Sequence, residues 1–259
     1  QAAYTAGDDL LHMCYDFDFL SGTYPSGDQV AAVLERFQRI VTEGWACWAY
    51  SNHDVVRHPT RWSLEEPALR AYAALLMSIQ GSVCLYQGEE LGLTEAYVAY
   101  EDLQDPYGKR FWPKFKGRDG ARTPMPWVAD HQYGGFTDVR PWLPVAVEHL
   151  RLAVGAQERD PDSTLAFYRA MIAFRRAHKA LVTGAMEVAD HAPGHVVLIR
   201  SHGDSRLACA FNLSDTALDL ALPAGRWQQD RGAPFSARLE DGRAHLPPWQ
   251  ALFAIDEAA

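Results

Sequence analysis

The tripeptide Asn52-His53-Asp54 combines side chains that can hold a sugar, and it directly follows the apolar segment 45–50. An imidazole can donate a hydrogen bond to one ring hydroxyl, and a carboxylate can accept hydrogen bonds from neighbouring hydroxyls. In glycoside cleavage, hydrogen bonds to the 2-hydroxyl strengthen in the transition state, so an aspartate there favours that state. Taken alone, the tripeptide favours a plainer interpretation, in which Asp54 caps the next segment and His53 faces solvent.

Other charged side chains lie near the ends of the same apolar segments. We interpret Arg57 as a structural ion-pair partner, with support from behind a binding site as the alternative. Glu89 and Glu90 are neighbouring carboxylates, a pattern that invites a catalytic interpretation. We favour a structural role for both, in which they hold loops by hydrogen bonds.

The composition indicates a globular protein and disfavours two kinds of partner. The chain has 259 residues, of which 48% are apolar, and a formal net charge of -9. This charge disfavours electrostatic binding of nucleic acid or of anionic membrane lipid. No apolar run approaches the roughly 20 residues that a membrane-spanning helix needs.

The cysteines and the first residue suggest where the protein acts and how it begins. The cysteines do not form a CxxC pair, so we expect neither a zinc site nor a disulfide framework. A reducing, cytoplasmic compartment fits this pattern. The chain starts with Gln1 in place of methionine, and we therefore expect that the beginning of the protein is missing.

The first part of the chain contains three strand-helix units. Their apolar spacing predicts strands at 10–14, 45–50 and 82–86, and helices at 28–42, 65–79 and 164–179. Ser63 and Ser163 are the expected N-caps of the last two helices, because a serine hydroxyl can accept from the free backbone N–H groups there. The segment 88–161 between the third strand and the last helix shows little periodicity, and loops this long are usually functional.

After about residue 180 the pattern changes to short apolar segments separated by Gly, Asp and Pro. Strands are expected at 196–199, 207–211, 218–220 and 251–255. This spacing predicts a small antiparallel β-sandwich domain over 181–259, which follows a strand-helix domain over 1–180.

Three strand-helix units leave an open parallel sheet, although parallel sheets are normally buried on both faces. The units therefore belong either to a small three-layer domain or to the end of an eight-stranded barrel. In a barrel the loops at the C-terminal ends of the strands build the active site, which is where Asn52-His53-Asp54 lies.

Further motifs decide between these possibilities. They are Gln87-Gly88-Glu89-Glu90, Asp105-Pro106-Tyr107-Gly108, Phe111-Trp112-Pro113 and the run from Gly117 through Arg122-Thr123-Pro124-Met125-Pro126-Trp127. Together with Asn52-His53-Asp54, their order and spacing resemble the α-amylase superfamily of glycoside hydrolases, in particular its α-glucosidase and oligo-1,6-glucosidase branch. The resemblance covers the whole chain.

The resemblance implies an α/β fold, in which the three strands are strands six to eight of a (β/α)8 TIM barrel and a β-sandwich follows. It implies that Asp54 stabilises the transition state and that His53 binds the same glucose. It also implies that Arg122 closes the bottom of the pocket, as in an exo-acting enzyme that removes single glucose units.

The same resemblance places the nucleophile Asp and the acid/base Glu of a retaining enzyme before Gln1, in an N-terminal half. We expect this chain alone to be inactive and not to fold stably. The expected partners are that half and an α-glucoside or oligosaccharide substrate. No metal or cofactor is expected in this segment, because a calcium site would belong to the missing half.

Two other functions remain possible at this stage. The chain could belong to a non-catalytic amylase-like scaffold, such as the ectodomain of amino-acid transporter heavy chains, or it could be an isolated glycan-binding module. Retention of His53, Asp54 and Arg122 favours the enzyme, because a scaffold does not need a glucose pocket. Preference for α-1,4 or α-1,6 linkages, and the balance of hydrolysis and transfer, do not follow from this sequence.

Overall fold

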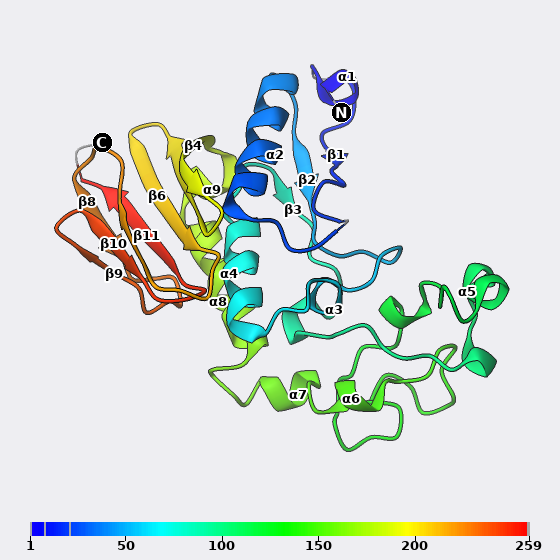
Figure 1. Cartoon of the computed structure of the whole chain (residues 1–259). Helices are drawn as coiled ribbons and strands as arrows, with labels where there is room; N and C mark the ends of the chain where they lie inside the picture. Colours follow the sequence, from blue (N-terminus) through cyan, green and yellow to red (C-terminus); the bar gives the residue numbers. More distant parts are fainter. Residues whose placement is uncertain (1, 8, 21, 258–259) are drawn as a thin grey trace.

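The first domain is a small parallel sheet with helices packed on one side. The computed structural model describes residues 2–7, 9–20 and 22–257. Strands β1 (Cys14–Tyr15), β2 (Ala46–Trp48) and β3 (Ser82–Val83) pair in parallel in the order β1-β2-β3. The helices are α1 (Ala2–Thr5), α2 (Gly27–Ile40), α3 (His58–Trp62), α4 (Glu66–Leu76), α8 (Thr164–Ala177) and α9 (Lys179–Thr183). Figure 1 shows α2, α4 and α8 between this sheet and the C-terminal strands.

The helix ends follow from their capping residues. Ser26 begins α2 with a capping box, in which its side chain and that of Gln29 each accept from the other residue's backbone N–H. Ser163 accepts from the backbone N–H of Ala166 and begins α8, as expected. The prediction for Ser63 was wrong, because Ser63 ends α3 in a left-handed conformation, with φ of 55°. Glu65 precedes α4 without a side-chain cap.

The predicted position of the first strand was also wrong. We expected it at 10–14, but the ladder is formed by Cys14–Tyr15, and its hydrogen bonds start at Cys14, whose N–H donates to the Trp45 carbonyl. Leu10 and Leu11 are about half exposed, at 51% and 56%. The apolar side chains of residues 10–13 alone indicated a strand in that segment. The backbone hydrogen bonds to the neighbouring segment begin only with the Trp45 carbonyl, which accepts from Cys14.

The second domain is the expected antiparallel β-sandwich, with more strands than the sequence indicated. One sheet has the order β4-β5-β6-β11-β8 and the other the order β7-β10-β9. The strands are β4 (Ala185–Ala192), β5 (His195–His202), β6 (Ser205–Asn212), β7 (Leu218–Ala221), β8 (Trp227–Asp230), β9 (Arg238–Glu240), β10 (Arg243–Leu246) and β11 (Ala251–Asp256).

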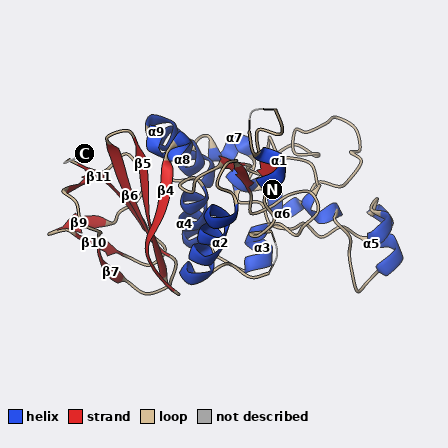
Figure 2. Ribbon diagram, turned by 90° about the horizontal axis from the view of Figure 1, so that it is seen from above, coloured by secondary structure: helices blue, strands red, loops and turns tan. Residues whose placement is uncertain are grey.

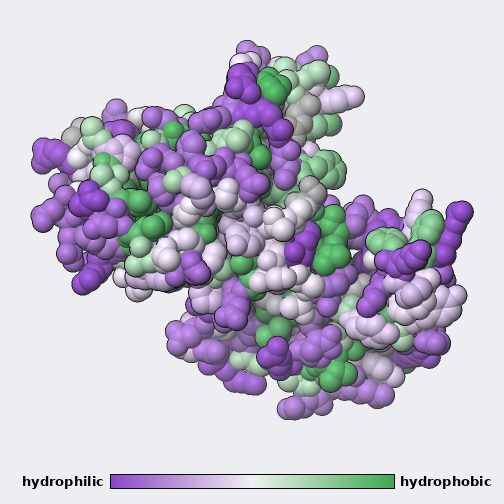
Figure 3. All heavy atoms as spheres, in the orientation of Figure 1, coloured by the Kyte–Doolittle hydropathy of each residue, from purple (hydrophilic) through white to green (hydrophobic). Residues whose placement is uncertain are grey.

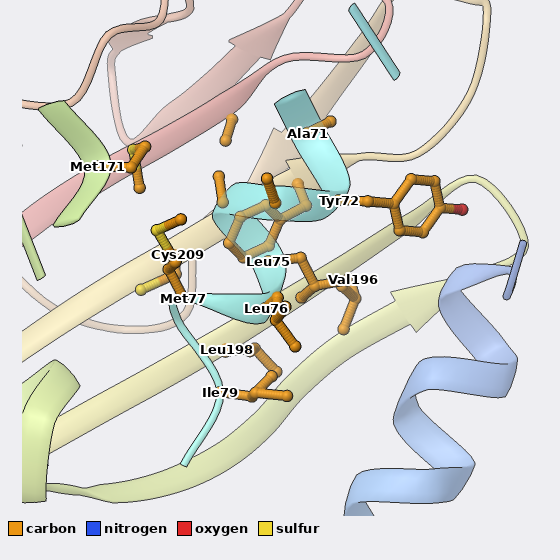
Figure 4. Packing of buried hydrophobic residues seen from close by; sticks show 14 of the residues in the cluster. Ala71, Tyr72, Leu75, Leu76, Met77, Ile79, Met171, Val196, Leu198 and Cys209 are labelled. Carbon is orange, nitrogen blue, oxygen red and sulfur yellow. The ribbon is translucent and has the colours of Figure 1, made fainter. Parts of the chain in front are cut away.

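Both faces of the five-stranded sheet are buried. Val197 and Ile199 of β5 pack toward the three-stranded sheet, whereas Val196 and Leu198 pack toward the helices. Figure 4 shows Leu76 and Met77, at the end of α4, beside Leu198 and Cys209. The two domains therefore share one continuous apolar core.

The long segment after β3 forms a separate lobe of loops and short helices. It contains η1 (Glu89–Leu91), η2 (Tyr100–Asp102), α5 (Pro106–Phe111), η3 (Asp119–Ala121), α6 (Val147–Leu150) and α7 (Val154–Gln157). In Figure 2 this lobe lies on the far side of the helices from the sandwich. Figure 3 shows a largely hydrophilic surface with apolar atoms next to the notch between this lobe and the helical layer. Among the described residues, no helix is long and apolar enough to cross a bilayer.

The shared core predicts a large cost for removing a side chain that joins the two domains. Leu198→Ala should lower the free energy of unfolding by about 2 to 5 kcal/mol, because Leu198 is fully buried against the helices. Chemical denaturation of the complete protein, which includes the expected N-terminal half, would measure this. The control Val147→Ala removes an exposed side chain and should change stability by less than about 0.5 kcal/mol. Equal effects of the two substitutions would contradict a shared core.

Candidate active site

The site lies where the chain leaves β2 and β3. Asn52 to Asp54 follow β2 directly, and the Asn52 side chain accepts a hydrogen bond of 2.8 Å from the backbone N–H of Asp54. This turn presents His53 and Asp54 to solvent, with side chains that are 65% and 49% exposed. The C-terminal ends of parallel strands thus position the tripeptide as expected for a barrel active site.

The structure brings the three predicted site residues together. Arg122 donates from Nε to the His53 carbonyl at 2.8 Å and from Nη2 to Asp54 Oδ1 at 3.1 Å. The His53 ring nitrogen Nε2 lies 3.4 Å from Asp54 Oδ2. A base, a carboxylate and a guanidinium therefore converge on one small surface. Such a group can accept from and donate to adjacent hydroxyls of one sugar ring.

The sequence interpretation missed Arg118, which also contacts Asp54. Its Nη1 donates to Asp54 Oδ1 at 3.0 Å, while its Nε donates to Asp105 Oδ2 at 2.9 Å. Hydrogen bonds from the Arg118 side chain are the main reason that the pKa of Asp105 falls to about 2. Asp105 and Arg118 each belong to a motif recognised in the sequence. They lie on opposite sides of α5, however, and no sequence spacing indicates that they pair.

Arg57 supports the site from beneath. Its side chain is buried and donates to the Gln87 carbonyl at 2.7 Å and to the Ala121 carbonyl at 3.0 Å, and its guanidinium lies over the Tyr86 ring. Its backbone N–H donates to the Glu95 carboxylate. The expected ion pair was wrong: the Arg57 side chain donates to backbone carbonyls, which fits the alternative, support from behind the site.

Glu89 and Glu90 form the loop-holding hydrogen bonds that we expected. Glu89 Oε2 accepts from the Tyr86 N–H at 2.7 Å, and Glu90 Oε2 accepts from the Gly88 N–H at 2.8 Å. Glu89 is buried, and its Oε1 lies 3.5 Å from Nδ1 of His58, which is also buried. Burial raises the pKa of Glu89 to about 8 and lowers that of His58 to about 3. Both groups are therefore mainly uncharged near neutral pH.

A shallow cavity of about 350 Å³ adjoins the site. Arg122 and Gln87 line it together with Phe136 and Trp142, two residues that are 52% and 67% exposed. In the described part of the chain, no three His, Cys, Asp or Glu side chains are grouped as metal ligands would be.

The fold and the site define an α-amylase-type catalytic domain. Residues 6–184 match the family model for the alpha amylase catalytic domain, and the chain belongs to that family. Residues 183–253 match a domain of unknown function, DUF3459. The parallel strands are accordingly part of a TIM barrel, and a β-sandwich follows, as the sequence predicted.

Similar proteins place the chain within the family. It is 48% identical to a probable alpha-glucosidase from Rhizobium meliloti, covering 97% of this chain and 46% of that protein. It is 28% identical to an oligo-1,6-glucosidase of Heyndrickxia coagulans, covering 77% and 40% respectively. The crystal structure of an alpha-glucosyl transfer enzyme, XgtA, superposes with a TM-score of 0.91 at 45% identity, covering 99% and 48%. The chain spans about half the length of these relatives.

The buried carboxyl group predicts how stability depends on pH. His58 is uncharged in the folded chain, whereas in the unfolded chain it loses its remaining proton as pH rises from 6.5, so its own contribution to stability rises slightly. Between pH 6.5 and 8, Glu89 is ionised when unfolded but keeps its proton when folded, since its pKa rises from 4.5 to about 8. Its contribution to stability therefore falls as pH rises, by at most about 1.4 kcal/mol per pH unit.

Glu89→Gln keeps the shape of the side chain and removes the proton. In the complete protein, the free energy of unfolding, measured by denaturant titration at pH 6.5 and 8, should fall less steeply for this variant than for the wild type. Identical pH dependence of the two proteins would show that Glu89 is already ionised in the fold.

Proposed function

We propose that this chain is the C-terminal half of a retaining exo-α-glucosidase that releases single glucose units from short α-glucosides. The contact of Arg122 with Asp54 carries the proposal, because it joins the loops after β2 and β3 into one hydroxyl-binding corner. Asp54 is the transition-state stabiliser, and His53 and Arg122 bind the glucose. The nucleophile Asp and the acid/base Glu come from an N-terminal half.

The open edges of the parallel sheet support a partner half. Leu10, Leu11 and Met13 beside β1 are about half exposed. On the other side, a groove of about 640 Å³ runs along β3 and is lined by apolar side chains, including Val83, Leu85 and Ile172. In a closed barrel, further strands would pair with β1 and β3, and helices would cover these apolar surfaces. We propose residues 1–180 as the barrel part and 181–259 as the sandwich.

Transfer of glucose to other acceptors is a second activity that the same site favours. The solved relative at 45% identity is described as an alpha-glucosyl transfer enzyme. In a retaining mechanism, a covalent glucosyl-enzyme intermediate can be attacked by water or by another hydroxyl. The exposed rings of Phe136 and Trp142 beside Arg122 suit a flat or apolar acceptor.

The role of Asp54 predicts the effect of an isosteric change in the complete enzyme. Asp54→Asn keeps the shape of the side chain but loses the charge, and it should lower kcat on an aryl α-glucoside by on the order of 100- to 1000-fold or more. Asp138→Asn, at a fully exposed carboxylate, is the matched control. Near-normal turnover by Asp54→Asn, with an unchanged melting curve, would refute the assignment.

The incomplete barrel predicts that residues 1–259 alone are inactive. Expressed by itself, the chain should release no glucose from an aryl α-glucoside and should show no cooperative melt, since three strands cannot close the barrel. Co-expression with the N-terminal half should restore both signals. Activity of the isolated chain would contradict the proposal, and binding of α-glucosides by an inactive complete protein would favour the scaffold alternative.

A further inference from the structure

We propose that Arg118 is a positioning residue that fixes the Asp54 carboxylate for contact with the substrate hydroxyls. This inference rests on the proposed function. Arg118 spans two carboxylates: its Nε and Nη2 donate to Asp105 at 2.9 and 3.1 Å, and its Nη1 donates to Asp54 Oδ1 at 3.0 Å. One planar guanidinium thus links a buried anchor to the site.

Asp54 needs such a contact, because its own segment fixes only its backbone. The Asn52 side chain holds the Asp54 N–H, but the Asp54 side chain is 49% exposed. The carboxylate of an exposed aspartate can rotate about its terminal torsion, which is broad. Arg118 and Arg122 both donate to Oδ1, so Oδ2 remains on the side of His53.

The anchor of Arg118 is more rigid than that of Arg122. The Asp105 side chain is fully buried and also accepts from the backbone N–H groups of Tyr107 and Arg118. Asp119, itself buried, accepts from the Asp105 N–H at 2.8 Å. Arg122, by contrast, is held on the far side by a single hydrogen bond to the His53 carbonyl.

Close backbone packing completes this anchor. Gly117 has a φ of +80°, and a Cβ built there would lie 2.8 Å from Gly108 Cα and 3.0 Å from Asp105 Oδ2. Only glycine lets the two segments approach this closely. The backbone of α5 and the residue before Arg118 therefore pack in direct contact, and this contact fixes the position of the Arg118 backbone relative to Asp105.

This arrangement predicts a selective effect on the transition state. The 2-hydroxyl of the substrate interacts more strongly in the transition state than in the ground state, and Asp54 is its proposed acceptor. Without Arg118, the Asp54 carboxylate samples other orientations, and the stabilisation that depends on its position is lost. Arg118 itself contacts no sugar in this proposal.

The test compares the complete enzyme with its Arg118→Ala variant on p-nitrophenyl α-glucoside and on the 2-deoxy analogue. We expect kcat on the glucoside to fall by about 10- to 100-fold, with KM changed less than about threefold. On the 2-deoxy analogue the fall should be much smaller, because the hydroxyl that Asp54 binds is absent. Asp105→Asn should give the same pattern, since it loosens the anchor.

Two further variants separate positioning from stability. Arg118→Lys keeps the charge but cannot reach both carboxylates in the same way, so its kcat should fall while its melting curve stays close to the wild type. Arg169→Ala breaks the exposed ion pair with Glu158 and should leave kcat unchanged. Arg118→Lys keeps the test valid if Arg118→Ala does not fold.

Two results would overturn the proposal. Equal losses on both substrates would mean that Arg118 only supports the loop, and a raised KM with unchanged kcat would mean that it binds sugar directly. If the wild-type complete enzyme cleaves no α-glucoside, the proposed function fails instead, and that outcome is visible before any variant is measured.

Discussion

The site depends on the buried guanidinium of Arg57. Its side chain donates to the carbonyls of Gln87 and Ala121, so it holds together the two ends of the segment 87–121 that follows β3. Arg122 follows Ala121 directly, so this interaction sets where its side chain starts. A buried cation that satisfies two carbonyls avoids the cost of an unpaired charge and fixes the loop ends at the same time.

A second buried arginine, Arg200, also donates to backbone carbonyls, at the junction of the two domains. Arg200 of β5 is fully buried and donates to the carbonyls of Ala185, Gly184 and Ser78. Burial lowers its pKa to about 10, so it remains charged at neutral pH. Ser78 closely follows α4. The Arg200 side chain therefore links the sandwich to the helix that packs behind β2. The β-sandwich acts as a support for the barrel helices.

Sequence patterns predicted the elements whose signals are local. The stripe and cap of α8 lie within one segment, and Ser163 alone marks its start. The strands β4, β8, β9 and β10 escaped prediction because they alternate weakly or are short. The expected strand at 196–199 lies within β5, and its burial is continuous from Val196 to Arg200, because helices cover one face and a second sheet covers the other.

The residues of the candidate site likewise differ in whether a local sequence signal marks them. His53 and Asp54 were predictable because they directly follow a strand, and Arg122 because it belongs to a motif of the family that the sequence resembles, although their roles in substrate binding stay predictions. Arg118 was not predictable, since its place over Asp54 depends on the packing of Gly108 against Gly117 and on the buried carboxylate of Asp105. Contacts between distant loop segments leave no periodicity in a sequence.

This division explains how three strands of a barrel can carry a nearly complete version of the proposed sugar-binding corner. Within the described residues, the hydrogen bonds and ion pairs of Asp54 all involve residues from Asn52 to Arg122, and the supporting residues Arg57 and Asp105 lie in the same stretch. The corner is built by loops that hydrogen-bond to one another, whereas in the proposed enzyme a closed sheet would bring it against the catalytic carboxylates of the N-terminal half. Under the proposed function, the geometry of sugar binding is thus local to this chain, and the covalent chemistry depends on barrel closure.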